Sequence, residues 1–202
     1  MDRPDSFKTV KNKSDIEIKI KGSKFIGRAR PCRREQEAED RLTFIRKKYY
    51  DATHNCFAFR LGIGKHQTFR YSDDGEPSGT AGKPIFDQLE GRDLTNILVV
   101  VTRYFGGTKL GTGGLSRAYS EAAGAAIEVA EVIEKFITRS LIMTVEFPDY
   151  NQVERIIHQL GGNIVGADFK EKVGLKVEIR LSMVQKLRES LINATAGRIV
   201  IA

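Results

Sequence analysis

The stretch "NILVVVTRYFGGTKLGTGGLSRAYSEAAG", residues 96–124, joins three local patterns. Its apolar run, 97–101, is typical of a strand that is buried on both faces of a sheet. A segment with five glycines follows at 106–114. After it, an alanine-rich segment predicts a helix to about residue 130, whose small side chains allow close packing against a sheet. The stretch therefore predicts a strand, then a glycine-rich turn, then the start of a helix. Anion-binding sites in proteins are often formed by elements in this order.

The patterns that surround this stretch predict the rest of a first domain. Isoleucines alternate with charged residues before a Lys-Gly-Ser turn, so residues 14–31 are expected to form a β-hairpin. A helical period follows at 35–50, with one apolar face. The other expected elements of this domain are strands at 54–62 and 66–72 and a short helix at 85–93.

Residues 135–202 predict a second, self-contained domain. The expected order is strand, helix, strand, strand, helix, strand, which is the βαββαβ order of ferredoxin-like domains. We therefore place the domains at 1–134 and 135–202. The expected elements of the second are strands at 136–147, 163–170, 173–181 and 198–201 and helices at 149–160 and 183–193.

The composition is that of a soluble globular protein, with 202 residues, 41% of them hydrophobic and 29% charged. No apolar run has the length of a membrane span, so no membrane partner is expected. The two cysteines, Cys32 and Cys56, lack the spacing of a disulfide framework or a zinc site, which favours a cytoplasmic location. The sequence is silent on oligomeric state.

The net charge of +7 is unevenly distributed. Residues 1–34 carry eleven Lys or Arg against four acids, whereas residues 35–134 carry twelve against fifteen. A basic segment of this kind attracts nucleic acid without sequence specificity. It is equally compatible with a solvated basic surface, and the charge alone does not separate the two.

The glycine segment is a candidate phosphate site, because backbone N–H groups and the helix dipole favour an anion at a helix start. Lys109 lies inside it, and Arg103 and Arg117 lie at its edges. It lacks the marks of a nucleotide site. Lys109 is followed by Leu110 rather than by the Ser or Thr of a P-loop, and Ser116 replaces the third glycine of a dinucleotide fingerprint. A tightly held mononucleotide is therefore disfavoured.

The hypothesis of a phosphate site also assigns roles to two aromatic residues and three glycines. Tyr104 and Phe105 could stack on bases or could be core residues. The backbone N–H groups that would contact a phosphate are those of Gly111, Gly113 and Gly114. The alternative is architectural, with Gly113 and Gly114 allowing close packing at a sharp corner between strand and helix, and the sequence leaves both open.

A second polar segment, "DDGEPSGTAGKP" at 73–84, concentrates turn-forming residues. Asp73, Asp74 and Glu76 offer oxygen ligands for Mg²⁺ or a general base, and Lys83 lies near its end. The segment departs from the calcium-loop pattern, and adjacent aspartates before a glycine are typical of a tight turn. A structured turn is therefore favoured, and neither a metal nor a cofactor is predicted.

No catalytic residue is predicted from the sequence. His54 and Cys56 are assigned to opposite faces of their strand, which argues against a Cys/His nucleophile. Ser78 does not lie in the G-x-S-x-G pattern of a nucleophile elbow.

The segments "YSDDGEPSGTAGKPI" and "NILVVVTRYFGGTKLGTGGLSRAYSEAA", in this order, resemble those of the YigZ/IMPACT family. The resemblance covers residues 1–130 directly, and the tail is similar to the C-terminal domain of bacterial members. It implies an α+β protein whose N-terminal domain resembles the second domain of ribosomal protein S-five. It also implies a ferredoxin-like C-terminal domain that resembles the last domain of elongation factor G.

The resemblance also suggests a function. These folds recur in proteins that contact ribosomal or transfer RNA, and eukaryotic relatives regulate translation by competing for the activator of a kinase. It transfers no catalytic residues, only the shared motifs Asp73–Lys83 and Arg103–Arg117. The leading hypothesis is a non-catalytic RNA- or ribosome-associated protein that acts on translation.

Two alternatives remain. One is a protein-interaction module that uses the exposed faces of the C-terminal sheet. The other is an enzyme for a small phosphorylated molecule, with Mg²⁺ on Asp73 and Asp74 opposite the glycine segment.

Overall fold

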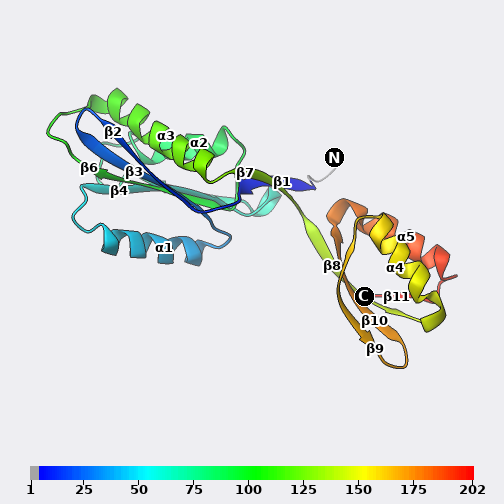
Figure 1. Ribbon diagram of the computed structural model, residues 1–202. Helices are drawn as coiled ribbons and strands as arrows, with labels where there is room; N and C mark the ends of the chain where they lie inside the picture. The colour runs from blue at the N-terminus through cyan, green and yellow to red at the C-terminus, as the bar shows by residue number, and fades with distance from the viewer. Residues whose placement is uncertain (1–4) are drawn as a thin grey trace. The chain divides into compact units, whose positions relative to one another are not determined.

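A computed structural model describes residues 5–202, which fall into two units (Figure 1). The larger unit contains residues Phe7–Lys135, and the smaller contains Phe136–Ala202 together with Asp5 and Ser6. The expected start of the first domain at residue 1 lies outside the described residues. Within these residues, none of the helices combines the length and the apolar character that crossing a membrane requires.

The larger unit is built on an antiparallel five-stranded sheet of order β2-β3-β6-β4-β5. Helix α1 covers one face of this sheet, and α2 and α3 cover the other (Figure 1). The strands are β2 (Ser14–Ile20), β3 (Ser23–Pro31), β4 (His54–Leu61), β5 (Thr68–Ser72) and β6 (Ile97–Tyr104). The helices are α1 (Glu35–Lys48), α2 (Gly82–Glu90) and α3 (Gly111–Val129).

The central strand β6 is buried on both faces, as its unbroken apolar sequence predicts. Val99 and Val101 belong to the core shared with α2 and α3, whereas Leu98 and Val100 belong to the core under α1. Alternate residues of a strand point to opposite faces, so one apolar run supplies both cores. The predicted hairpin at 14–31 and the apolar face of α1 are confirmed as well.

Helix α3 lies unusually close to the sheet. A Cβ atom added at Gly27 of β3 would lie 2.3 Å from the carbonyl oxygen of Ala122. The alanines on this side of α3 are buried, which confirms the close packing that their size predicts: Ala118, Ala122, Ala123 and Ala126.

The smaller unit has the predicted ferredoxin-like topology, with an antiparallel sheet of order β11-β8-β10-β9. Helices α4 and α5 supply the other half of its core, through Val153, Ile157, Leu187 and Leu191. The elements are β8 (Thr138–Val145), α4 (Tyr150–Gln159), β9 (Asn163–Phe169), β10 (Val173–Arg180), α5 (Val184–Ala194) and β11 (Val200–Ile201). The chain is therefore an α+β protein, as expected.

Two features differ from the sequence-based expectations. Strands β1 (Ser6–Val10) and β7 (Val132–Phe136) form a two-stranded sheet that was not predicted. Each strand is short, and its local sequence does not reveal that the strand with which it pairs lies far along the chain. Helix α2 begins at Gly82 rather than at 85, because hydrogen bonds to a distant carboxylate fix its first turn.

The close approach of α3 predicts that Gly27→Ala lowers the free energy of unfolding. The new methyl group would overlap the α3 backbone, at a cost of about 1–3 kcal/mol. Gly166→Ala in β9 is the control, because a Cβ atom there would lie 3.6 Å from its nearest neighbour. Denaturant unfolding that shows equal stability for both variants would contradict the close approach.

Candidate functional site

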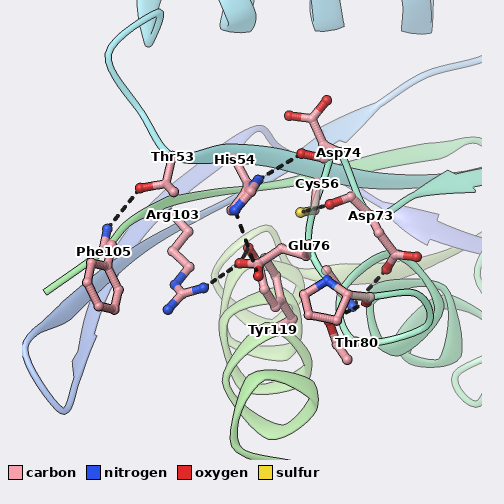
Figure 2. A network of polar contacts seen from close by, with 12 residues as sticks. Thr53, His54, Cys56, Asp73, Asp74, Glu76, Thr80, Arg103, Phe105 and Tyr119 are labelled. Carbon is pink, nitrogen blue, oxygen red and sulfur yellow. Dashed lines mark hydrogen bonds and ion pairs between the residues drawn. The ribbon is translucent and has the colours of Figure 1, made fainter. Parts of the chain in front are cut away.

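A buried ion pair lies at the end of β6 (Figure 2). The Arg103 guanidinium donates from Nη1 to Glu76 Oε1 at 2.6 Å, and the Tyr119 hydroxyl donates to the same oxygen at 2.8 Å. Glu76 and Arg103 are only 8% and 6% exposed. A buried carboxylate requires such partners, because an uncompensated charge in the interior is strongly unfavourable. The pair therefore joins the polar segment, the central strand and α3.

His54 completes the surroundings of Glu76. Its Nδ1 lies 2.8 Å from the carbonyl oxygen of Asp74, and its Nε2 lies 3.8 Å from Glu76 Oε2. A carbonyl oxygen can only accept a hydrogen bond, so Nδ1 carries the proton in the neutral ring. The second nitrogen then faces the carboxylate, and protonation of the ring would form an ion pair with Glu76.

The prediction that His54 and Cys56 point to opposite faces is wrong. Residues two apart in a strand share a face, and both side chains lie on the side of Glu76 and Tyr119 (Figure 2). Burial raises the pKa of the Cys56 thiol well above its usual range, and its Sγ donates to the carbonyl oxygen of Asp73 at 2.9 Å. Burial likewise raises the pKa of the Tyr119 hydroxyl. Cys56 is therefore a protonated core residue rather than a thiolate nucleophile.

Asp73 holds the start of α2. Its Oδ1 accepts the backbone N–H groups of Ala81 and Gly82 at 2.9 and 2.8 Å, and its Oδ2 accepts that of Gly79 at 2.9 Å. A carboxylate at a helix N-terminus satisfies N–H groups that have no partner within the helix. This contact begins α2 earlier than local patterning predicts.

Asp74 holds the other side of the same loop. Its Oδ2 accepts the backbone N–H of Asn55 at 2.7 Å, and its Oδ1 lies 3.0 Å from Arg46 Nη2. The described residues contain no group of three or more His, Cys, Asp or Glu side chains that could hold a metal ion. The acidic oxygens of the loop therefore serve its internal structure, which favours the structured turn over the magnesium alternative.

Lys83 lies on the exposed side of α2, away from this network. It pairs with Asp87 one helical turn later, and their hydrogen bond raises the pKa of the lysine. The structure therefore separates Lys83 from the three acidic residues of its motif.

The glycines of the second motif have different structural roles. A Cβ atom at Gly106 would lie 1.9 Å from the carbonyl carbon of Gly22, so this position requires glycine for contact with the β2–β3 turn. Gly107 and Gly111 adopt positive φ values of 85° and 72°, which glycine adopts without strain. These three residues are explained by the fold alone.

Gly113 and Gly114 are not explained in this way. A Cβ atom at Gly113 would approach only the Arg117 guanidinium, at 3.8 Å, and one at Gly114 would meet only Leu110, at 3.2 Å. Gly113 therefore permits no close contact with another element, whereas Gly114 gives Leu110 room, so the architectural alternative stays open for Gly114. Glycine within a helix costs about 1 kcal/mol relative to alanine. The two glycines thus leave the backbone of the first turn of α3 accessible to solvent, and they lower the stability of the helix.

The start of α3 is also open to an anion. No side chain caps this helix, and Lys109 and Arg117 are exposed beside its first turn. Uncapped N–H groups and the positive end of the helix dipole attract negative charge. The structure therefore brings together Lys109, Arg117 and the backbone of Gly111, Gly113 and Gly114.

The other predicted site residues lie differently. Arg103 is committed to Glu76, which argues against direct contact with a phosphate. The Tyr104 hydroxyl donates to Asp51 at 2.9 Å, while Lys24 Nζ lies 4.6 Å from the centre of its ring. Phe105 is 48% exposed, and its backbone N–H donates to Thr53 at 3.0 Å. Of the two predicted aromatic residues, Phe105 is thus the one whose ring is more available for stacking.

Comparison with known proteins agrees with these two motifs and two units. The Impact N-terminal domain matches residues 21–127, and a domain of unknown function, DUF1949, matches residues 143–198. The chain belongs to the IMPACT family. IMPACT family member YvyE of Bacillus subtilis (strain 168) is 33% identical over 193 residues, covering 96% of this chain and 88% of that protein.

Further IMPACT relatives support this assignment. IMPACT family member YigZ of Escherichia coli (strain K12) is 32% identical over 179 residues, which is 88% of each chain. Protein IMPACT of Oryctolagus cuniculus matches only 65 residues, at 37% identity, covering 32% of this chain and 20% of that protein. A solved structure titled "Crystal structure of an hypothetical protein" superposes with a TM-score of 0.69 at 30% identity, covering 98% of this chain and 97% of the other.

Sequence reasoning missed His54 and Tyr119 as neighbours of Glu76. The strand period could have placed His54 and Cys56 on one face. Nothing local identifies Tyr119 as a hydrogen-bond donor, since it lies 43 positions along the chain from its partner.

The buried pair predicts that Glu76→Gln lowers the free energy of unfolding by about 3 kcal/mol, because Arg103 keeps its charge without a counter-ion. Glu121→Gln on the exposed side of α3 is the matched control, with an expected change within about 0.5 kcal/mol. Urea unfolding measures both. A loss for Glu76→Gln no larger than that of the control would contradict a structural role for the pair.

Substitution by alanine should have opposite effects on stability at a glycine that is packed against another segment and at a glycine that is not. Gly106→Ala overlaps the Gly22 backbone and should destabilise by about 3 kcal/mol. Gly113→Ala restores helix propensity and should stabilise by about 0.5–1 kcal/mol. Thermal unfolding distinguishes them, and a large loss for Gly113→Ala would show that this glycine has a packing role after all.

Proposed function

We propose that this protein is a non-catalytic, cytoplasmic RNA- or ribosome-associated protein that acts in the regulation of translation. The first turn of α3 would receive a phosphate of the RNA backbone. Lys109 and Arg117 would supply charge, and the backbone N–H groups of Gly111, Gly113 and Gly114 would supply neutral donors. Phe105 would stack on a base, while Arg103 and Tyr104 would position the turn.

The observation that carries this proposal is the open first turn of α3. Gly113 there has no packing role and Gly114 meets only Leu110, no side-chain hydrogen bond within residues 5–202 caps the helix, and two exposed basic residues lie alongside. A ligand that approaches the backbone explains all three features, since a side chain at either glycine would obstruct the approach. The net charge of +7 supports an anionic partner.

The features of the site favour a polymer over a small nucleotide. The turn lacks the Gly-Lys-Ser/Thr ending of a P-loop, and the nearby carboxylates already accept hydrogen bonds from the chain. An extended RNA needs no enclosed pocket, because several weak phosphate contacts add up along its backbone. The translation role follows from what membership of the IMPACT family implies.

The same observations disfavour the enzyme alternative. Asp73 and Asp74 would have to release N–H partners before binding Mg²⁺, and Cys56 remains a thiol. A protein partner on the C-terminal sheet remains compatible with the fold, because Ile142 and Val200 on that sheet are 60% and 64% exposed.

Co-sedimentation with ribosomes and their subunits over a salt series tests the proposal. Lys109→Ala/Arg117→Ala should weaken pelleting and reduce the slope of log affinity against log salt by about 1.5, close to the value for two phosphate contacts. Lys47→Ala/Lys65→Ala is the control, since it removes the same charge from exposed positions elsewhere in the unit.

Two results would overturn the proposal. Wild-type protein that remains at the top of the gradient at low salt would exclude ribosome association. Equal losses for the two double variants would show that net charge, rather than the α3 turn, attracts the RNA.

A further inference from the structure

A second basic surface lies on the opposite face of the sheet, away from α3. Helix α1 packs over β4 and β6, which leaves the adjoining face of β2 and β3 uncovered. A groove of about 990 Å³ runs between this face and α1. Five basic residues line it: Lys13, Arg28, Arg30, Arg41 and Lys48.

Arg28 is the least exposed of these residues, at 2%. Its Nε lies 3.0 Å from Asp15 Oδ1, and its Nη1 donates to Thr102 Oγ1 at 2.7 Å. The ring of Tyr49 lies 4.0 Å from its Cζ atom. Its Nη2 has no hydrogen-bond partner among residues 5–202. A buried guanidinium with an unused donor is costly, because that donor lacks the hydrogen bond that it would make in water.

The acidic residues of the groove do not cancel its positive charge. Asp15, Glu17 and Asp40 also line it, but Asp15 is shared between Arg28 and Arg30, at 3.0 and 2.6 Å. Three carboxylates therefore line the groove with five basic residues, one of which, Arg41, is also paired with Glu37 outside the lining at 2.6 Å. Burial acts to raise the pKa of Tyr49, but Arg28 and Lys48 outweigh it and lower that pKa, which reflects the positive surroundings of the ring.

Aromatic rings lie beside the basic residues of the groove. Phe44 lines the groove and is 64% exposed. Arginine and lysine beside an accessible ring are what a single strand needs, because phosphates bind the cations while a base stacks on the ring. An acidic peptide would use the charges but not the ring.

We propose that this groove binds single-stranded RNA, with a base on Phe44 and the strand phosphates along Lys13 and Lys48. The groove adds a second surface to the proposed function without depending on the α3 turn. A duplex does not fit this assignment, since its bases are stacked on one another and are not free to pack on Phe44.

Fluorescence anisotropy with a labelled oligouridine of about ten nucleotides tests the groove. Phe44→Ala should weaken binding about tenfold through loss of one stacked base. Its control is Tyr50→Ala, which removes a ring that is 86% exposed and lies outside the groove lining. Exposed positions are chosen because a change at buried Arg28 would also disturb the fold.

Charge variants supply a second, independent measurement. Lys13→Ala/Lys48→Ala should reduce the salt slope by about 1.4. Lys47→Ala/Lys65→Ala, which removes the same charge outside the groove lining, should leave the slope close to that of wild type.

Several outcomes would overturn the proposal. Equal effects of the two lysine pairs would indicate diffuse attraction, and unchanged binding by Phe44→Ala would remove the stacking role. Equal competition by uridine monophosphate would make the ligand a free nucleotide, and equal competition by polyglutamate would make it an acidic peptide. If only Lys109→Ala/Arg117→Ala loses the oligouridine, the groove proposal fails while the α3 proposal stands.

Discussion

The larger unit depends on the ion pair between Glu76 and Arg103. It joins a loop to the central strand, and Tyr119 adds α3 to the same carboxylate oxygen. Buried ion pairs contribute little net stability compared with apolar packing, but the loss of one partner is strongly unfavourable. The pair therefore mainly specifies the position of the loop, because any other position of the loop would leave one of the two charges buried without its partner.

This constraint determines how the neighbouring residues are used. With Glu76 fixed inside, Asp73 and Asp74 face outward from the same loop and hold α2 and β4. The acidic motif is thus a framework in which each carboxylate has a backbone or side-chain donor. Chemistry at these oxygens would require the framework to open.

A second group of residues takes no part in this framework. Lys109 and Arg117 are exposed beside an uncapped helix, and its first-turn glycines have room for a ligand. On the opposite face of the sheet, the basic groove contains an Arg28 donor that has no partner within residues 5–202. In the two proposals each surface would bind phosphate, and together they would allow one RNA to contact two faces of the unit.

The sequence by itself determined most of the secondary structure and the order of the units, but not the pairing of β1 with β7. Period-two alternation identified β2, the unbroken run identified β6, and the βαββαβ order identified the ferredoxin-like unit, because local periodicity reports which face of an element is buried. Only the tertiary structure decided what each charged residue does. Arg103 and Lys109 lie six positions apart and look alike in sequence, yet one is buried against Glu76 and the other is exposed. The difference arises from contacts between segments distant in the chain, which no local pattern records.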